Sequence, residues 1–188
     1  MSGNSLEILD VSLRYGSKTI FDKMSIKLPQ NNNLLIAGPN GSGKTSLLRI
    51  LAGELKPDSG QINVQQSIYM PVSPVNPGFR NISEYLQLTG GAKTHPLTYV
   101  GDVADRLTHK SMNALSSGEF KSAALARVLS IQRRVYLLDE PTITLDKVAI
   151  DNLIEAIREL NSRGCSVVIS TNNPEDLQEI KWSEIHLG

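Results

Sequence analysis

One cysteine, no net charge and no long apolar run are the first features of this sequence. Lys and Arg together number 19, as do Asp and Glu, so no whole-molecule field attracts nucleic acid or an anionic membrane, and any anion must be bound at a local site. No stretch reaches the roughly 20 apolar residues that cross a bilayer. The opening segment MSGNSLEILD lacks the layout of a secretory signal. We therefore expect a cytoplasmic protein without a nucleic-acid partner.

The single cysteine, Cys165, has no second cysteine with which to form a disulfide in this chain. It lies in the apolar run CSVVI, where we expect a small core residue rather than a nucleophile or a metal ligand. The 188 residues are 40% hydrophobic and 20% charged, which is typical of a globular protein with one core. We expect residues 1–188 to form a single domain.

Apolar and polar residues alternate near the start of the chain, which predicts two half-buried antiparallel strands. A short apolar run, a glycine-rich loop and a helical pattern follow them, and later a turn leads into two more short strands. The strands expected in this half are residues 6–13, 24–28, 34–37, 62–64 and 68–70.

The pattern weakens between residues 71 and 114, where prolines and glycines separate short helical pieces, and we interpret this region as an inserted subdomain. Helices and buried strands then alternate to the end of the chain, which is typical of an α/β fold. The helices expected are residues 82–88, 100–107, 118–130, a segment around 150–157, and 175–180. The strands expected are residues 135–138, 165–170 and a short one near 185.

Residues 38–45, GPNGSGKT, match the pattern G-x-x-x-x-G-K-[ST] between a predicted strand and a predicted helix. Glycines let the backbone N–H groups surround a phosphate, and the helix adds its positive N-terminal end. Lys44 should contact the β- and γ-phosphates, and the Thr45 hydroxyl should help to bind Mg²⁺. The predicted nucleotide-binding residues of this segment are Gly38, Pro39, Asn40, Gly41, Ser42, Gly43, Lys44, Thr45 and Ser46.

Two carboxylates, Asp139 and Glu140, follow the apolar run of residues 135–138. They stand at the strand edge where open α/β sheets bind ligands. Beside a phosphate loop, Asp139 can orient Mg²⁺, and Glu140 can polarise the water that attacks a γ-phosphate. The sequence therefore predicts a nucleoside triphosphatase or kinase site.

The segment LSSGE, residues 115–119, opens the helix that precedes this acidic strand end. It resembles the LSGGQ signature of the ATP-binding cassette (ABC) family. The resemblance implies that Ser117 and Gly118 reach the γ-phosphate of an ATP held by another subunit. It also implies a fold, which is a P-loop ATPase with a mixed core sheet, an N-terminal antiparallel β part and a small helical subdomain, here at about residues 72–114.

Two other segments match the family. Tyr15, in LRYGSKTIF, stands where the family places an aromatic ring on adenine, and residues 141–146, PTITLD, resemble the D-loop that crosses the dimer interface. Within the family, residues 38–53 are most similar to small bacterial exporter ATPases, including the haem-exporter subunits of cytochrome c maturation.

Two positions depart from the family pattern. Val72 stands where a glutamine usually contacts Mg²⁺ and the attacking water, and Asn172 stands where a histidine usually contacts the γ-phosphate. Valine can neither coordinate a metal nor donate a hydrogen bond, whereas asparagine can still donate one. We expect Mg-ATP binding with slow hydrolysis, Glu140 acting as the base and Asn172 as a weaker phosphate contact.

The resemblance implies two partners. One is a second nucleotide-binding subunit, either identical or a related cassette, which forms a head-to-tail ATP sandwich. The other is a separate membrane-spanning subunit that would hold the protein at the cytoplasmic face of a membrane, in an exporter more readily than an importer. An alternative is an ATP-dependent interaction switch in a complex without a membrane subunit. A metabolic P-loop kinase does not explain residues 115–119 and 141–146 together.

Overall fold

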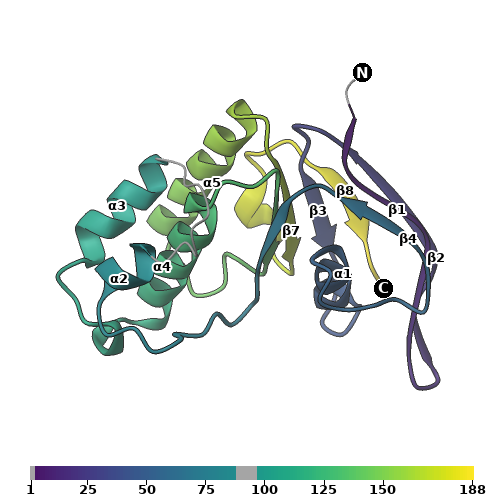
Figure 1. The fold of residues 1–188 in the computed structure, drawn as a ribbon, viewed down its shortest axis with the longest axis horizontal. Helices are drawn as coiled ribbons and strands as arrows, with labels where there is room; N and C mark the ends of the chain where they lie inside the picture. Colours follow the sequence, from purple (N-terminus) through teal and green to yellow (C-terminus); the bar gives the residue numbers. More distant parts are fainter. Residues whose placement is uncertain (1–2, 88–96) are drawn as a thin grey trace.

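The computed structural model of the chain describes residues 3–87 and 97–188, which form two β-sheets with helices against them (Figure 1). The central sheet is entirely parallel, with the strand order β5-β6-β7-β3-β8. Helices flank this sheet on both sides, so its three inner strands are buried along their whole length. The five strands are β5 (Ser67–Met70), β6 (Val135–Asp139), β7 (Ser166–Thr171), β3 (Leu34–Ala37) and β8 (Ser183–His186).

The second sheet is antiparallel, as the alternating pattern predicts, with the order β2-β1-β4. Its strands are β1 (Asn4–Tyr15), β2 (Lys18–Pro29) and β4 (Ser59–Val64). Helix α1 (Lys44–Leu51) lies between the two sheets (Figure 1). A core of side chains from β1, α1 and the parallel sheet joins these three layers. The α/β class with an N-terminal antiparallel part is therefore confirmed, and the core sheet that was expected to be mixed is parallel throughout, because the antiparallel strands form a sheet of their own.

The other face of the parallel sheet is covered by helices (Figure 1). A second core cluster joins them to the strands. The helices are α2 (Ile82–Gln87), α3 (Thr98–Leu107), the 3-10 helix η1 (Met112–Ala114), α4 (Ser117–Ser130) and α5 (Lys147–Ser162). The first three belong to the predicted subdomain at about residues 72–114, of which residues 88–96 lie outside the described residues. The helix predicted at residues 82–88 is present as α2 up to Gln87, and its last predicted residue lies outside the described residues.

Several element boundaries differ from the sequence prediction. Strand β2 begins at Lys18 rather than at residue 24. The segment expected as a helix at 175–180 is a short 3-10 helix, η2 (Pro174–Leu177). Helix α1 ends at Leu51, because Gly53 takes a left-handed backbone with a φ of 76°. Strand β4 begins at Ser59, ahead of the strand expected at residues 62–64. Within residues 3–87 and 97–188, every helix is too short or too polar to span a bilayer.

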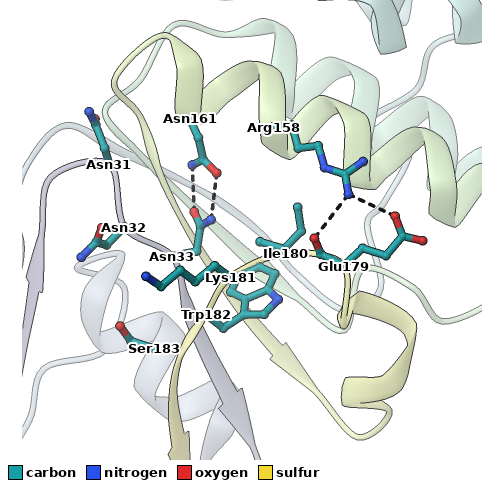
Figure 2. Close-up of a pocket in the computed structure, with 10 residues that line it drawn as sticks. All are labelled: Asn31, Asn32, Asn33, Arg158, Asn161, Glu179, Ile180, Lys181, Trp182 and Ser183. Carbon is teal, nitrogen blue, oxygen red and sulfur yellow. Dashed lines mark hydrogen bonds and ion pairs between the residues drawn. The ribbon is translucent and has the colours of Figure 1, made fainter.

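A pair of amide side chains fixes the start of β3. Asn33 and Asn161 exchange two hydrogen bonds of 2.8 and 2.9 Å across a polar cavity of about 320 Å³ (Figure 2). Asn33 also accepts a hydrogen bond from the Val167 backbone N–H, so it joins β3, α5 and β7. Cys165 is buried beside this pair, and burial raises the pKa of its thiol, which confirms the expected core residue.

Candidate functional site

Three neighbouring parallel strands end at the same edge of the central sheet. Their register pairs Ala37 with Thr171 and Asp139 with Ser170. The glycine-rich loop after β3, the acidic end of β6 and the residues after β7 therefore lie side by side, where open α/β sheets bind their ligands. The sequence-predicted residues of these three segments meet at one site.

The loop of residues 38–43 depends on glycine at two close contacts. Gly38 has a φ of 147°, and a Cβ there would come within 2.2 Å of the Leu187 carbonyl oxygen. Gly43 has a φ of 106°, and its Cβ would meet the Ile20 side chain at 2.5 Å. Both positions therefore need glycine for backbone conformation and for space. Gly41, at a φ of 78°, has the same left-handed backbone.

Lys44, the first residue of α1, is buried beneath this loop. Its Nζ donates hydrogen bonds to the carbonyl oxygens of Gly38 and Pro39, at 2.8 and 3.2 Å. It also donates to Asn172 Oδ1 at 2.7 Å and lies 3.6 Å from Glu140 Oε1. The ammonium therefore stands where the loop and the ends of β6 and β7 converge.

Asp139 is fully buried at the end of β6 and accepts hydrogen bonds from three hydroxyl groups. Thr45 Oγ1 donates to Oδ2 at 2.8 Å. No local pattern in the sequence marks the other two donors. Tyr69, from β5, donates to Oδ2 at 3.2 Å, and Ser170, from β7, donates to Oδ1 at 2.5 Å. Burial, together with the charge of Asp139, raises the pKa of the Tyr69 phenol.

Glu140 follows Asp139 with a left-handed backbone, at a φ of 46°. Its N–H donates to the carbonyl oxygen and the hydroxyl of Ser170, both at 3.1 Å. Its Oε2 accepts the backbone N–H of Asn172 at 3.1 Å. These contacts fix the carboxylate beside Lys44.

Asn172 bridges the end of β7 to the loop. Its Oδ1 accepts from Lys44, and its Nδ2 donates to Asn40 Oδ1 at 2.9 Å. The Tyr15 hydroxyl shares a hydrogen bond of 3.2 Å with Ser46 Oγ, in the first turn of α1. Half of the Tyr15 surface is exposed, so its ring is accessible to a nucleotide base.

The signature segment lines a different cavity, of about 310 Å³. Ser116 is the N-cap of α4 and forms a capping box with Glu119. The S-x-x-E pattern at residues 116–119 is a sequence signal for this cap, although the sequence prediction named only Ser117 and Gly118. Ser117 is the first residue of the helix. A Cβ on Gly118 would come within 2.5 Å of the Thr144 carbonyl oxygen, so the D-loop packs directly on the signature segment.

The donor set fits a magnesium nucleotide. Ser42 Oγ, in the phosphate loop, is buried and has no hydrogen-bond partner among the described residues, as a hydroxyl reserved for a phosphate would be. Residues 3–87 and 97–188 hold no group of three or more His, Cys, Asp and Glu side chains able to bind a metal ion. Thr45 and Asp139, joined by a hydrogen bond of 2.8 Å, could hold Mg²⁺ together with phosphate oxygens, and the bound ion would neutralise phosphate charge.

Val72 follows the end of β5, and 40% of its surface is exposed. Its side chain offers no ligand to the site. Its carbonyl oxygen accepts a hydrogen bond from Lys121 Nζ, which the sequence did not predict.

Comparison with known proteins gives one family. The ABC transporter family matches residues 21–73 and 92–143. A cytochrome c biogenesis ATP-binding export protein of Gluconobacter oxydans is 29% identical over 187 residues, covering 97% of this chain and 88% of that protein. Its counterpart in a Chelativorans strain is 32% identical, covering 88% and 92%. A zinc import ATP-binding protein of Photobacterium profundum is 28% identical, covering 89% and 68%.

Solved structures share the fold. An ATP-binding subunit of an ABC transporter superimposes with a TM-score of 0.84 at 20% identity, covering 97% of this chain and 85% of that one. An inward-facing metal-chelate type ABC transporter gives 0.82 at 23%, covering 99% and 80%. The resemblance to the export ATPases of cytochrome c maturation is also confirmed. The family match spans more than half of the residues, and the chain is therefore an ATPase subunit of the ABC transporter family.

Proposed function

We propose that this chain powers an ABC exporter by binding Mg-ATP, pairing head to tail with a second cassette and hydrolysing the nucleotide. The observation that carries the proposal is the convergence of Lys44, Glu140 and Asn172 at the phosphate loop. The relatives that are named export proteins favour export, although a zinc import protein is also similar.

Within the site, Glu140 would polarise the attacking water and Lys44 would bind the β- and γ-phosphates. Without nucleotide, all the described contacts of the Lys44 ammonium are to the protein's own oxygens. A phosphate entering the loop would compete for this ammonium, so Glu140 would exchange its contact with Lys44 for one with water. Asn172, next to both groups, would contact the γ-phosphate. Tyr15 and Ser46 would lie near the adenine ring of the nucleotide.

The need for a second subunit follows from the separation of two surfaces. The cavity at Ser117 and Gly118 is lined by α3, α4 and the D-loop and includes none of residues 38–46. The positive N-terminal end of α4 therefore opens away from the chain's own phosphate loop and suits a phosphate held by another copy or a related cassette. ATP would join the two subunits, and hydrolysis would separate them.

We also propose slow hydrolysis and an attachment to a membrane subunit. Neither Val72 nor Asn172 can supply the metal ligand or the cationic donor usual at those positions. Loss of one oriented contact in such a site costs on the order of a hundredfold in rate.

The segment of residues 71–107, which begins where the chain leaves strand β5, would bind a membrane-spanning subunit at the cytoplasmic face of a membrane. The domain assignment, one nucleotide-binding domain with this helical part inside it, remains part of the proposal.

The test compares the purified wild-type chain with Glu140→Gln. The wild type should hydrolyse Mg-ATP slowly, and the substitution should lower the rate by about a hundredfold or more, since it removes the general base. With hydrolysis blocked, Mg-ATP should convert Glu140→Gln from monomer to dimer in analytical ultracentrifugation. Glu184→Gln, on the exposed edge strand β8, is the matched control and should keep the wild-type rate.

A wild-type rate unaffected by Glu140→Gln would contradict the role of Glu140. A chain that stays monomeric with Mg-ATP in both forms would contradict the homodimer and leave a related cassette as the partner. Purification of the native complex from membranes should yield a membrane-spanning subunit. A native complex that lacks one would favour the interaction switch instead.

A further inference from the structure

Lys121 is a buried lysine in the second turn of the signature helix α4, and the proposed ATPase mechanism does not use it. Only 4% of its surface is exposed. Its Nζ donates a hydrogen bond of 2.7 Å to the carbonyl oxygen of Val72, 49 positions earlier in the chain. The Lys121 side chain therefore joins the signature helix to the backbone of the segment that follows β5.

A lysine buried to this extent requires an explanation. Moving an ammonium out of water costs several kcal/mol unless other groups compensate for it. No ion pair among residues 3–87 and 97–188 includes Lys121. Burial lowers the pKa of Lys121, and the negative charges of Asp139 and Glu140 oppose this shift. The counter-charges of this ammonium are thus the two carboxylates of the ATPase site.

The charges of the site agree with this assignment. The described hydrogen bonds to the Asp139 carboxylate come from the uncharged hydroxyls of Thr45, Tyr69 and Ser170. Lys44 pairs with Glu140. Lys121 thus adds a second positive charge whose field reaches these carboxylates.

The hydrogen-bonded carbonyl also has a particular place in the chain. It belongs to the first residues after β5, where the chain leaves the sheet edge toward α2. Pro71 has no N–H to donate, and neither the Pro71 nor the Val72 side chain has a polar atom, so these side chains form no hydrogen bond to the site. The Lys121 side chain supplies that link.

We propose that Lys121 is a positioning residue of the ATPase site, which fixes the backbone at Val72 through its hydrogen bond to the carbonyl oxygen. This rests on the proposed function, since it assigns a role in ATP hydrolysis. Through this contact, the signature helix and the segment that leads into the helical subdomain move together. Lys121, which belongs to the signature helix, would supply the polar connection that the Val72 side chain cannot make.

The test uses Lys121→Met, Lys121→Arg and, as a matched control, Lys181→Met on the exposed far side of the sheet. Methionine keeps much of the side-chain volume without charge, so the fold should remain stable. Steady-state ATP hydrolysis should show a loss of kcat of about tenfold in Lys121→Met, from the loss of one charged hydrogen bond. KM for Mg-ATP should stay within about twofold of the wild-type value, and Lys121→Arg should recover most of the loss.

A direct signature is the ¹³C resonance of the Val72 carbonyl, measured with labelled valine. It should move in Lys121→Met and remain in place in Lys181→Met. An unchanged resonance, an unchanged kcat, or a loss of kcat that arginine does not recover would each overturn the inference. A wild-type chain without any hydrolysis would contradict the proposed function instead, and the Val72 resonance would then decide the link to Lys121 by itself.

Discussion

Lys44 and Asn172, 128 positions apart in the chain, are joined by a hydrogen bond of 2.7 Å from Nζ to Oδ1. The bond engages the lysine of the phosphate loop with an uncharged amide at the end of β7. A γ-phosphate that binds Lys44 has to compete with this amide oxygen. The residue at position 172 therefore influences both the availability of Lys44 and the donor that faces the phosphate.

Asn172→His should raise the rate of ATP hydrolysis. An imidazolium donates hydrogen bonds, carries positive charge and cannot accept from Lys44, so it would stabilise the transferred phosphoryl group and leave Lys44 available. We expect kcat to increase about tenfold, measured by phosphate release at saturating Mg-ATP. Asn173→His, at the adjacent exposed position, should leave kcat unchanged. An unchanged or lower rate in Asn172→His would remove the explanation of slow hydrolysis.

Gly118→Ala should destabilise the chain. Its Cβ would come within 2.5 Å of the Thr144 carbonyl oxygen, so the start of α4 and the D-loop would have to separate. We expect a loss of about 1–3 kcal/mol in the free energy of unfolding, as for other overpacked sites. The measurement is urea denaturation followed by circular dichroism.

Gly101→Ala is the matched control for that substitution. Gly101 lies within α3, and a Cβ there would meet no other atom within 4 Å. Alanine should therefore stabilise the chain by up to about 1 kcal/mol, because it loses less backbone entropy in a helix. If both substitutions changed stability in the same direction, the contact between Gly118 and Thr144 would not be the cause.

Asn33→Ala should also lower stability. The Asn33 side chain is buried and bonds to Asn161 and to the Val167 N–H (Figure 2). Its removal leaves these groups unsatisfied, at a cost of about 1–3 kcal/mol in the free energy of unfolding. Asn161→Ala should cost a similar amount, and the double substitution should cost less than the sum.

Asn32→Ala tests whether this effect belongs to the amide pair. Asn32 lines the same cavity but is exposed, and its substitution should change stability by less than about 0.5 kcal/mol. Additive losses from Asn33→Ala and Asn161→Ala in thermal or urea unfolding would contradict the coupling.

Ser116→Ala and Ser117→Ala should differ in their effects. Ser116 caps α4 through the Glu119 N–H, so its removal should cost about 1 kcal/mol of stability. Ser117 makes no such cap, and its substitution should leave stability unchanged while it weakens the Mg-ATP-dependent dimer of the Glu140→Gln variant. Equal dimerisation with and without Ser117→Ala would contradict the proposed phosphate contact.

The sequence alone determined the features that depend on near neighbours. The phosphate loop needs glycines at fixed positions beside a lysine, and this is a local property of residues 38–45. The alternating strands, the buried runs and the acidic end of β6 follow from the periodicity of apolar residues. Together they predicted the α/β fold class and a nucleoside triphosphate site. The family followed from the resemblance of residues 115–119 and 141–146 to known motifs, and the comparisons confirm it.

The tertiary structure decided which distant residues complete the site. Tyr69 and Ser170 reach Asp139, and Lys121 reaches Val72, across separations of 70, 31 and 49 positions. Tyrosine, serine and lysine occur throughout the sequence, and no local pattern marks these three. Their roles arise because parallel strands and packed helices bring separate segments to one edge of a sheet, where burial makes each polar group depend on a specific partner.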